Sequence, residues 1–81
     1  MFPSMRASRL LAVLLREPLG YRVVRQRGSH RRLVSARGYP SLTYAFHDHK
    51  TLPPGVVRDV LVGQVGLPVA TALRLVRGGG R

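Results

Sequence analysis

The stretch YRVVRQRGSHRRLVSA, residues 21–36, decides the fold of this chain. Its first part, residues 21–27, is rich in β-branched and aromatic residues, which favour extended strands. Gly28 and Ser29 suit a short turn, so residues 30–36 are able to return antiparallel to the first part. The stretch therefore predicts a β-hairpin.

A third strand is predicted directly after the hairpin. The residues RGYPS at 37–41 favour a second turn, and LTYAF at 42–46 favours a strand. HDHKTLPPG at 47–55 predicts a polar loop. Together with the hairpin, these segments predict a three-stranded antiparallel sheet.

A helix is predicted before the hairpin, from about Met5 to Glu17. Its apolar residues recur at i, i+3, i+4, i+7 and i+8 and form one stripe: Ala7, Leu10, Leu11, Leu14 and Leu15. Ser4 is the predicted N-cap, and Pro18 ends the helix. The stripe is expected to lie in the core.

Two more helices are predicted after the polar loop. The proline pair at 53–54 suits the first turn of a helix that ends at Gly66, with one apolar face made of Val57, Val60, Leu61 and Val65. Pro68 opens a last helix through about Val76, and residues 77–81 are expected to form a disordered tail. The order α-β-β-β-α(-α) predicts an α+β fold with the helices packed on one face of the sheet.

The composition indicates one domain with an anionic partner. A chain of 81 residues, 44% of them hydrophobic, is long enough for a single core over residues 1–81. Fourteen basic residues, all arginine except Lys50, stand against three acids and give a net charge of +11. Nucleic acid, an acidic protein or an anionic membrane would each balance this charge. The membrane is the weakest of the three, because the clearest amphipathic helix is needed for the core.

The N-terminal apolar run does not predict a secreted or membrane protein. LLAVLL at 10–15 is only six residues long, is followed by Arg16 and Glu17, and lacks a small-residue cleavage site. It is also too short to cross a bilayer. The chain has no cysteine, so it has neither disulfides nor a thiolate metal site, which fits a cytoplasmic protein.

His30 is the candidate catalytic residue, because it lies within the run RQRGSHRR at 25–32. RNA carries its own nucleophile, the 2′-hydroxyl, and its cleavage needs a group that moves protons and cations that hold the phosphate. A histidine is suited to the first task near neutral pH and needs no metal. Equally, His30 could be a solvated hairpin residue in a module that only binds RNA.

The candidate substrate-binding residues surround His30, and they are Arg25, Arg27, Ser29, Arg31 and Arg32. Arginine clamps phosphate through a planar fork of donors. Alternation along a strand puts Arg25 and Arg27 on one face and puts Arg32 on the same side as His30. These arginines could also form a solvated face or contact an acidic protein. Ser29 could donate a hydrogen bond to phosphate or only shape the turn.

The HDH run at 47–49 raises the question of a metal site. Two histidines and a carboxylate are good ligands, but the sequence offers no fourth ligand and no supporting partner, so we predict neither a metal nor another cofactor. His47 could instead act with His30 as an acid–base pair, or it could be an ordinary loop residue. No small-molecule ligand is predicted.

Two segments of the chain resemble one known family. GYRVVRQRGSHRR at 20–32, followed by LTYAFHDHKTLPPGVVRDVLVGQVGL at 42–67, is similar to the HicA (YcfA-like) family of small RNA-cleaving toxins from bacterial toxin–antitoxin pairs. The resemblance extends over about residues 8–73. Its most specific parts are the Gly-Ser-His motif at 28–30 and LPPG at 52–55.

The resemblance implies a fold, an activity and a partner. The family's fold is similar to a double-stranded-RNA-binding domain, its members cleave mRNA without the ribosome, and a HicB-type antitoxin masks the active site. The histidine that catalysis needs in the family corresponds to His30. The chain departs from the family pattern at SARGYPS (residues 35–41), at Tyr44 and Ala45, and in a more apolar last helix.

Two functions are consistent with the sequence. The first is an endoribonuclease toxin with His30 as its catalytic residue, held inactive by an antitoxin. The second is a non-catalytic, basic RNA-binding domain of the same fold. In either case, the apolar residues of the last helix could anchor a protein partner or pack within the chain: Val69, Leu73, Leu75 and Val76.

Overall fold

The predicted hairpin is the centre of a three-stranded antiparallel sheet in the computed structural model, which describes residues 1–78. Strand β2 (Tyr21–Arg27) pairs with β3 (His30–Ser35), and β3 pairs on its other side with β4 (Leu42–Tyr44). Gly28 lies in the turn with a φ of 58°, in the left-handed region that favours glycine. The predicted sheet is confirmed, with a third strand two residues shorter than expected.

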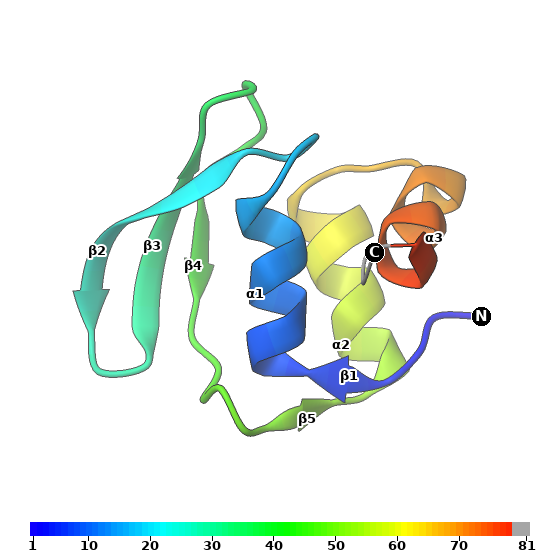
Figure 1. The fold of residues 1–81 in the computed structure, drawn as a ribbon, viewed down its shortest axis with the longest axis horizontal. Helices are drawn as coiled ribbons and strands as arrows, with labels where there is room; N and C mark the ends of the chain where they lie inside the picture. Colours follow the sequence, from blue (N-terminus) through cyan, green and yellow to red (C-terminus); the bar gives the residue numbers. More distant parts are fainter. Residues whose placement is uncertain (79–81) are drawn as a thin grey trace.

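The helices pack on one face of this sheet, as Figure 1 shows. They are α1 (Ala7–Leu15), α2 (Pro54–Arg58) and α3 (Val69–Gly78), with a π-helical turn, η1 (Asp59–Gln64), continuing α2. The α+β prediction is therefore confirmed. None of the helices within residues 1–78 is long and apolar enough to cross a membrane.

The last helix is longer than the sequence indicated. Arg77 and Gly78, which were expected to belong to a disordered tail, are in α3. The remaining residues of that expected tail, 79–81, lie outside the described residues.

A second, two-stranded sheet was not predicted. β1 (Met5–Arg6) pairs antiparallel with β5 (Thr51–Leu52), and Met5 lies opposite Leu52 with both side chains buried. The sequence placed Met5 in the first helix and the β5 residues in a loop. Strands of two residues are too short to show alternation, so only the tertiary pairing defines them.

The start of α1 is held by the loop after β4 and not by Ser4. The N-cap residue is Arg6, which makes no side-chain capping bond. The backbone N–H of Ala7 donates to the carbonyl of Lys50 at 2.8 Å, and that of Ser8 donates to the carbonyl of Asp48 at 3.1 Å. The predicted Ser4 cap is wrong, because these distant carbonyls satisfy the free N–H groups.

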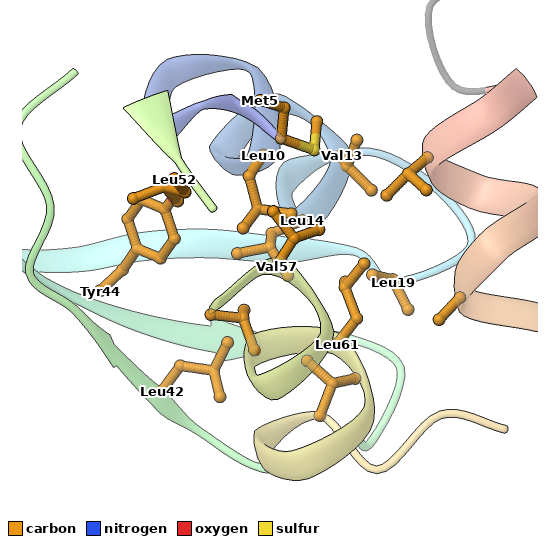
Figure 2. Close-up of a cluster of buried hydrophobic side chains, with 14 of the residues drawn as sticks. Met5, Leu10, Val13, Leu14, Leu19, Leu42, Tyr44, Leu52, Val57 and Leu61 are labelled. Atoms are coloured by element: carbon orange, nitrogen blue, oxygen red, sulfur yellow. The ribbon is translucent and has the colours of Figure 1, made fainter. Parts of the chain in front are cut away.

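One hydrophobic core fills the space between the sheet and the helices, and Figure 2 shows most of its side chains. The sheet contributes Tyr21, Leu33, Leu42 and Tyr44. The helices contribute Ala7, Leu10, Val13, Leu14, Val57, Val60, Leu61, Ala72 and Val76. Most of the predicted apolar stripe of α1 is therefore in the core.

Some apolar helix residues lie outside this core. Leu15 was predicted to belong to the buried stripe, but it is 40% exposed at the end of α1. In α3, Leu73 and Leu75 are half-buried against the core and Val69 remains exposed. Most of the apolar surface of α3 is thus used within the chain.

Tyr44 joins the sheet to α1. Its side chain is 1% exposed, and its hydroxyl donates a hydrogen bond to the carbonyl oxygen of Ala7 at 2.6 Å. Phe46 packs edge-on against its ring, with centroids 5.1 Å apart. Burial raises the pKa of the Tyr44 hydroxyl far above its ordinary value, so the hydroxyl stays protonated and keeps donating.

Removing this hydroxyl should weaken the fold. We expect Tyr44→Phe to lower the free energy of unfolding by about 1 kcal/mol, because a buried hydrogen bond is lost. Urea denaturation followed by circular dichroism measures the change. Tyr39→Phe is the control, since no hydrogen bond from the Tyr39 hydroxyl is found within residues 1–78. Equal stability of the two variants would show that the Tyr44 bond contributes nothing.

Candidate nucleic-acid interface

The uncovered face of the three-stranded sheet carries His30 and several arginines, of which Arg25, Arg27 and Arg32 lie nearest to His30 in the ladder. Within residues 1–78, all the helices lie on the opposite face (Figure 1). Arg27 lies directly opposite His30 in the ladder, and Arg25 lies opposite Arg32. Residues that face each other across an antiparallel pair project to the same side of the sheet. All four side chains therefore belong to one surface, which we call the outer face.

A β-bulge in β2 brings the arginines to this face. Tyr21 points into the core, and strict alternation would turn Arg25, four residues later, toward the core as well. The register shifts between Val23 and Arg25, so Val24 is left without a paired residue in β3. The sequence predicted that Arg25 and Arg27 share one face of their strand and that His30 and Arg32 share one face of theirs. The bulge is what places both pairs on the same face.

A groove of about 270 Å³ opens on the outer face, and we call it the histidine groove. It is lined by Arg25, Arg27, His30, Arg31, Arg32 and Thr43. Arg32 donates a long, exposed hydrogen bond from Nη1 to the Thr43 hydroxyl at 3.4 Å. Thr43 was not among the site residues predicted from the sequence. Its position between the buried Leu42 and Tyr44 on β4 is the signal that indicates an outward side chain.

The cations of the outer face lack carboxylate partners. Within residues 1–78, ion pairs join Arg37 to Glu17 and Arg31 to Asp48, each at 2.9 Å, and none involves an arginine of the outer face. Like charges directly opposite each other on neighbouring strands destabilise a sheet. The pairing of Arg25 with Arg32 is therefore unfavourable for folding alone, and it favours the binding of an anion.

Arg31 has a different position from the other predicted arginines. It lies opposite the buried Tyr44, and its side chain is only 13% exposed. Its Nη2 donates to Asp48 Oδ1 at 2.9 Å, while Nη1 is buried and has no hydrogen-bond partner within residues 1–78. This ion pair attaches the tip of the hairpin to the loop after β4. A role of Arg31 in phosphate contact stays a prediction.

A second groove, of about 260 Å³, lies between the hairpin turn and the loop after β4, and we call it the tip groove. It is lined by Gly28, Ser29, Arg31, Phe46, His47, Asp48 and His49. Ser29 lines this groove and not the histidine groove. The same is true of His47, so the geometry gives no support for an acid–base pair of His47 with His30.

The HDH run does not assemble a metal site in the part of the chain that the structure describes. Across residues 1–78, no group of three or more histidine, aspartate or glutamate side chains is placed to hold a metal ion. His47, Asp48 and His49 are exposed neighbours on one loop. All three residues line the tip groove.

The chain matches the model of a known protein family. A family model described as "HicA toxin of bacterial toxin-antitoxin" matches residues 7–67. The matched segment begins with α1 and includes the sheet, His30 and both grooves, and it ends before α3. No curated protein and no solved structure gives a significant match.

The two faces of the hairpin should respond differently to substitution. We expect Arg25→Gln to leave the free energy of unfolding unchanged or to raise it by up to about 0.5 kcal/mol, because a like charge opposite Arg32 is removed. Leu33→Ala, on the core side of β3, should cost about 2–5 kcal/mol. Urea denaturation at low salt compares them. A loss of more than about 1 kcal/mol in Arg25→Gln would assign this arginine a structural role.

Proposed function

This chain belongs to the HicA family of bacterial toxin–antitoxin toxins, and we propose that it is an endoribonuclease that cleaves mRNA without the ribosome, with His30 as its catalytic residue. The observation that carries the proposal is the outer face, where an exposed histidine shares a groove with arginines that no carboxylate neutralises within residues 1–78. The family membership supports the toxin role.

The chemistry begins at the 2′-hydroxyl of the RNA. In the proposed reaction the imidazole of His30 accepts the proton of this hydroxyl, the O2′–P bond forms, and the P–O5′ bond breaks. The departing 5′ oxygen takes a proton from solvent. The products are a 2′,3′-cyclic phosphate and a 5′-hydroxyl, and no metal ion takes part.

Three arginines are proposed to hold the reacting phosphate. Arg25, Arg27 and Arg32 line the same groove as His30, and each carries a planar fork that fits phosphate oxygens. As negative charge builds on the phosphorane, fixed cations stabilise it more than they stabilise the ground state. The Thr43 hydroxyl, which accepts a long hydrogen bond from Arg32, would favour this orientation of the guanidinium before the substrate arrives. Arg31 and Ser29 would contribute from the hairpin tip.

Replacing His30 should slow cleavage strongly. We expect the native chain to cut a long single-stranded RNA in the presence of EDTA, and His30→Ala to lose at least about 10²-fold in rate, because the proton acceptor is gone. Gel analysis of the RNA measures the rates. Arg58→Ala, which removes an exposed charge from α2, is the control and should cut normally.

Three outcomes would contradict this mechanism. Loss of cleavage in EDTA would show that a metal ion is needed. An undiminished rate in His30→Ala would exclude the histidine as the proton acceptor, and 3′-hydroxyl ends would indicate attack by water. A native chain that binds RNA without cutting it would support the alternative, a non-catalytic RNA-binding domain.

A HicB-type antitoxin of net negative charge is the proposed protein partner. The family is defined by toxin–antitoxin pairs. A net charge of +11 would steer an acidic protein to this chain, and the outer face presents cations that such a protein could neutralise. An antitoxin over the hairpin would cover His30 and block access of RNA. Val69 of α3 is a large exposed apolar residue that could add an apolar contact outside this face.

Masking can be tested by co-expression with the neighbouring small reading frame. We expect a complex that does not cleave RNA, and we expect the double variant Arg25→Glu, Arg32→Glu to bind the antitoxin at least tenfold more weakly, because opposite charges across the interface become like charges. Calorimetry measures the affinity, and Arg58→Glu is the matched control. A complex that cleaves RNA at the full rate would refute masking.

A further inference from the structure

We propose that the tip groove binds one unpaired RNA base next to the phosphate that is cleaved, and that Asp48 selects bases carrying an amino group over uracil. The inference rests on the proposed function, since it adds a specificity subsite to the same interface. The subsite is formed by the hairpin turn on one side and by Phe46, His47, Asp48 and His49 on the other.

The two grooves adjoin at the hairpin tip. Arg31 lines both of them, and the consecutive residues Ser29 and His30 line one groove each. In Figure 1, the turn between β2 and β3 and the segment after β4 lie at the same end of the molecule. An RNA strand that crosses the tip would therefore have a phosphate in the histidine groove and a neighbouring base in the tip groove.

The rings of the tip groove suit a base. Unpaired bases in protein–RNA complexes stack on aromatic and histidine side chains. His47 and His49 are exposed, and Phe46 is half-buried with its ring held edge-on against Tyr44. The groove thus offers flat surfaces, one of which is fixed by the core.

The carboxylate of Asp48 argues for a base and against a phosphate. It is one of only three acids in the chain, and it lines the tip groove. A carboxylate repels phosphate, whereas it accepts hydrogen bonds from the amino groups on base edges. The tip groove therefore differs in chemistry from the histidine groove, although the two adjoin.

Asp48 is held so that one oxygen remains available. Its Oδ1 accepts the hydrogen bond from Arg31 at 2.9 Å, and its backbone carbonyl accepts from the N–H of Ser8. Its Oδ2 has no hydrogen-bond or ion-pair partner within residues 1–78, and the side chain is 48% exposed. A fixed acceptor of this kind favours adenine, cytosine and guanine, which carry amino donors, over uracil, whose edge carries carbonyl oxygens beside its single N–H.

The experiment measures base preference in two ways. Cleavage ends from a randomised single-stranded RNA are sequenced, and binding of short RNAs that differ at one base is measured with the His30→Ala variant, so that binding is read without cleavage. We expect uracil to be depleted about tenfold at one fixed position beside the cut, and to bind about tenfold more weakly there.

Two variants and a control identify the residue responsible. Asp48→Asn keeps an oxygen for Arg31 but adds an amide donor that a uracil carbonyl accepts, so the depletion of uracil should disappear. His49→Ala should weaken binding of all four bases at this position through lost stacking. Asp59→Asn, the matched change in η1, should keep the native preference. A structural role of Asp48 alone would lower the rate without changing which bases are chosen.

The outcomes separate this inference from the proposed function. Cleavage without a base preference, or with a preference that Asp48→Asn leaves unchanged, would overturn the inference and leave the nuclease in place. Base-selective binding that Asp48→Asn removes, in a chain that never cleaves, would support the subsite and refute the nuclease. Absence of both cleavage and base-selective binding would refute both.

Discussion

Within residues 1–78, helices pack on only one face of the three-stranded sheet (Figure 1). This one-sided packing determines which side chains of the sheet are buried and which remain exposed. Side chains that point to the helices, such as Leu33 and Tyr44, are committed to the core. Those that point away are free of packing constraints and remain hydrated. Several arginines can gather there without the desolvation that burial would impose on them. The core and the proposed binding surface thus occupy opposite faces of one sheet.

The hairpin tip extends beyond the helices, as Figure 1 shows, so it needs its own attachments. The Arg31–Asp48 ion pair fixes the tip to the loop after β4, and carbonyls of that loop hold the start of α1. Tyr44 joins the same region to α1 through its hydroxyl. His30 is therefore next in sequence to an anchored residue, and a fixed position of this kind would benefit the catalytic role proposed for it.

The hairpin, the third strand and the helices could be predicted because each is a local pattern with a clear period or turn. The family could be named from the Gly-Ser-His and LPPG motifs, and the match over residues 7–67 confirms it. The β1–β5 pair, the cap of α1 by distant carbonyls and the tip groove could not be predicted, because each requires segments that meet only in the folded chain. The bulge at Val24 was missed because no local residue pattern marks it.

This bulge also determines which changes of length the chain can tolerate. The two-residue turn at Gly28 and Ser29 sets the pairing of Arg27 with His30, and this pair sets the register of β2 against β3 near the tip. Val24 has no partner in β3 and takes no part in this register. Deletion of Val24 would give an unbroken ladder from Tyr21 to Arg27. Every cation of the outer face would keep its present cross-strand neighbour. The register on which the site depends is therefore insulated from a deletion at this point of β2.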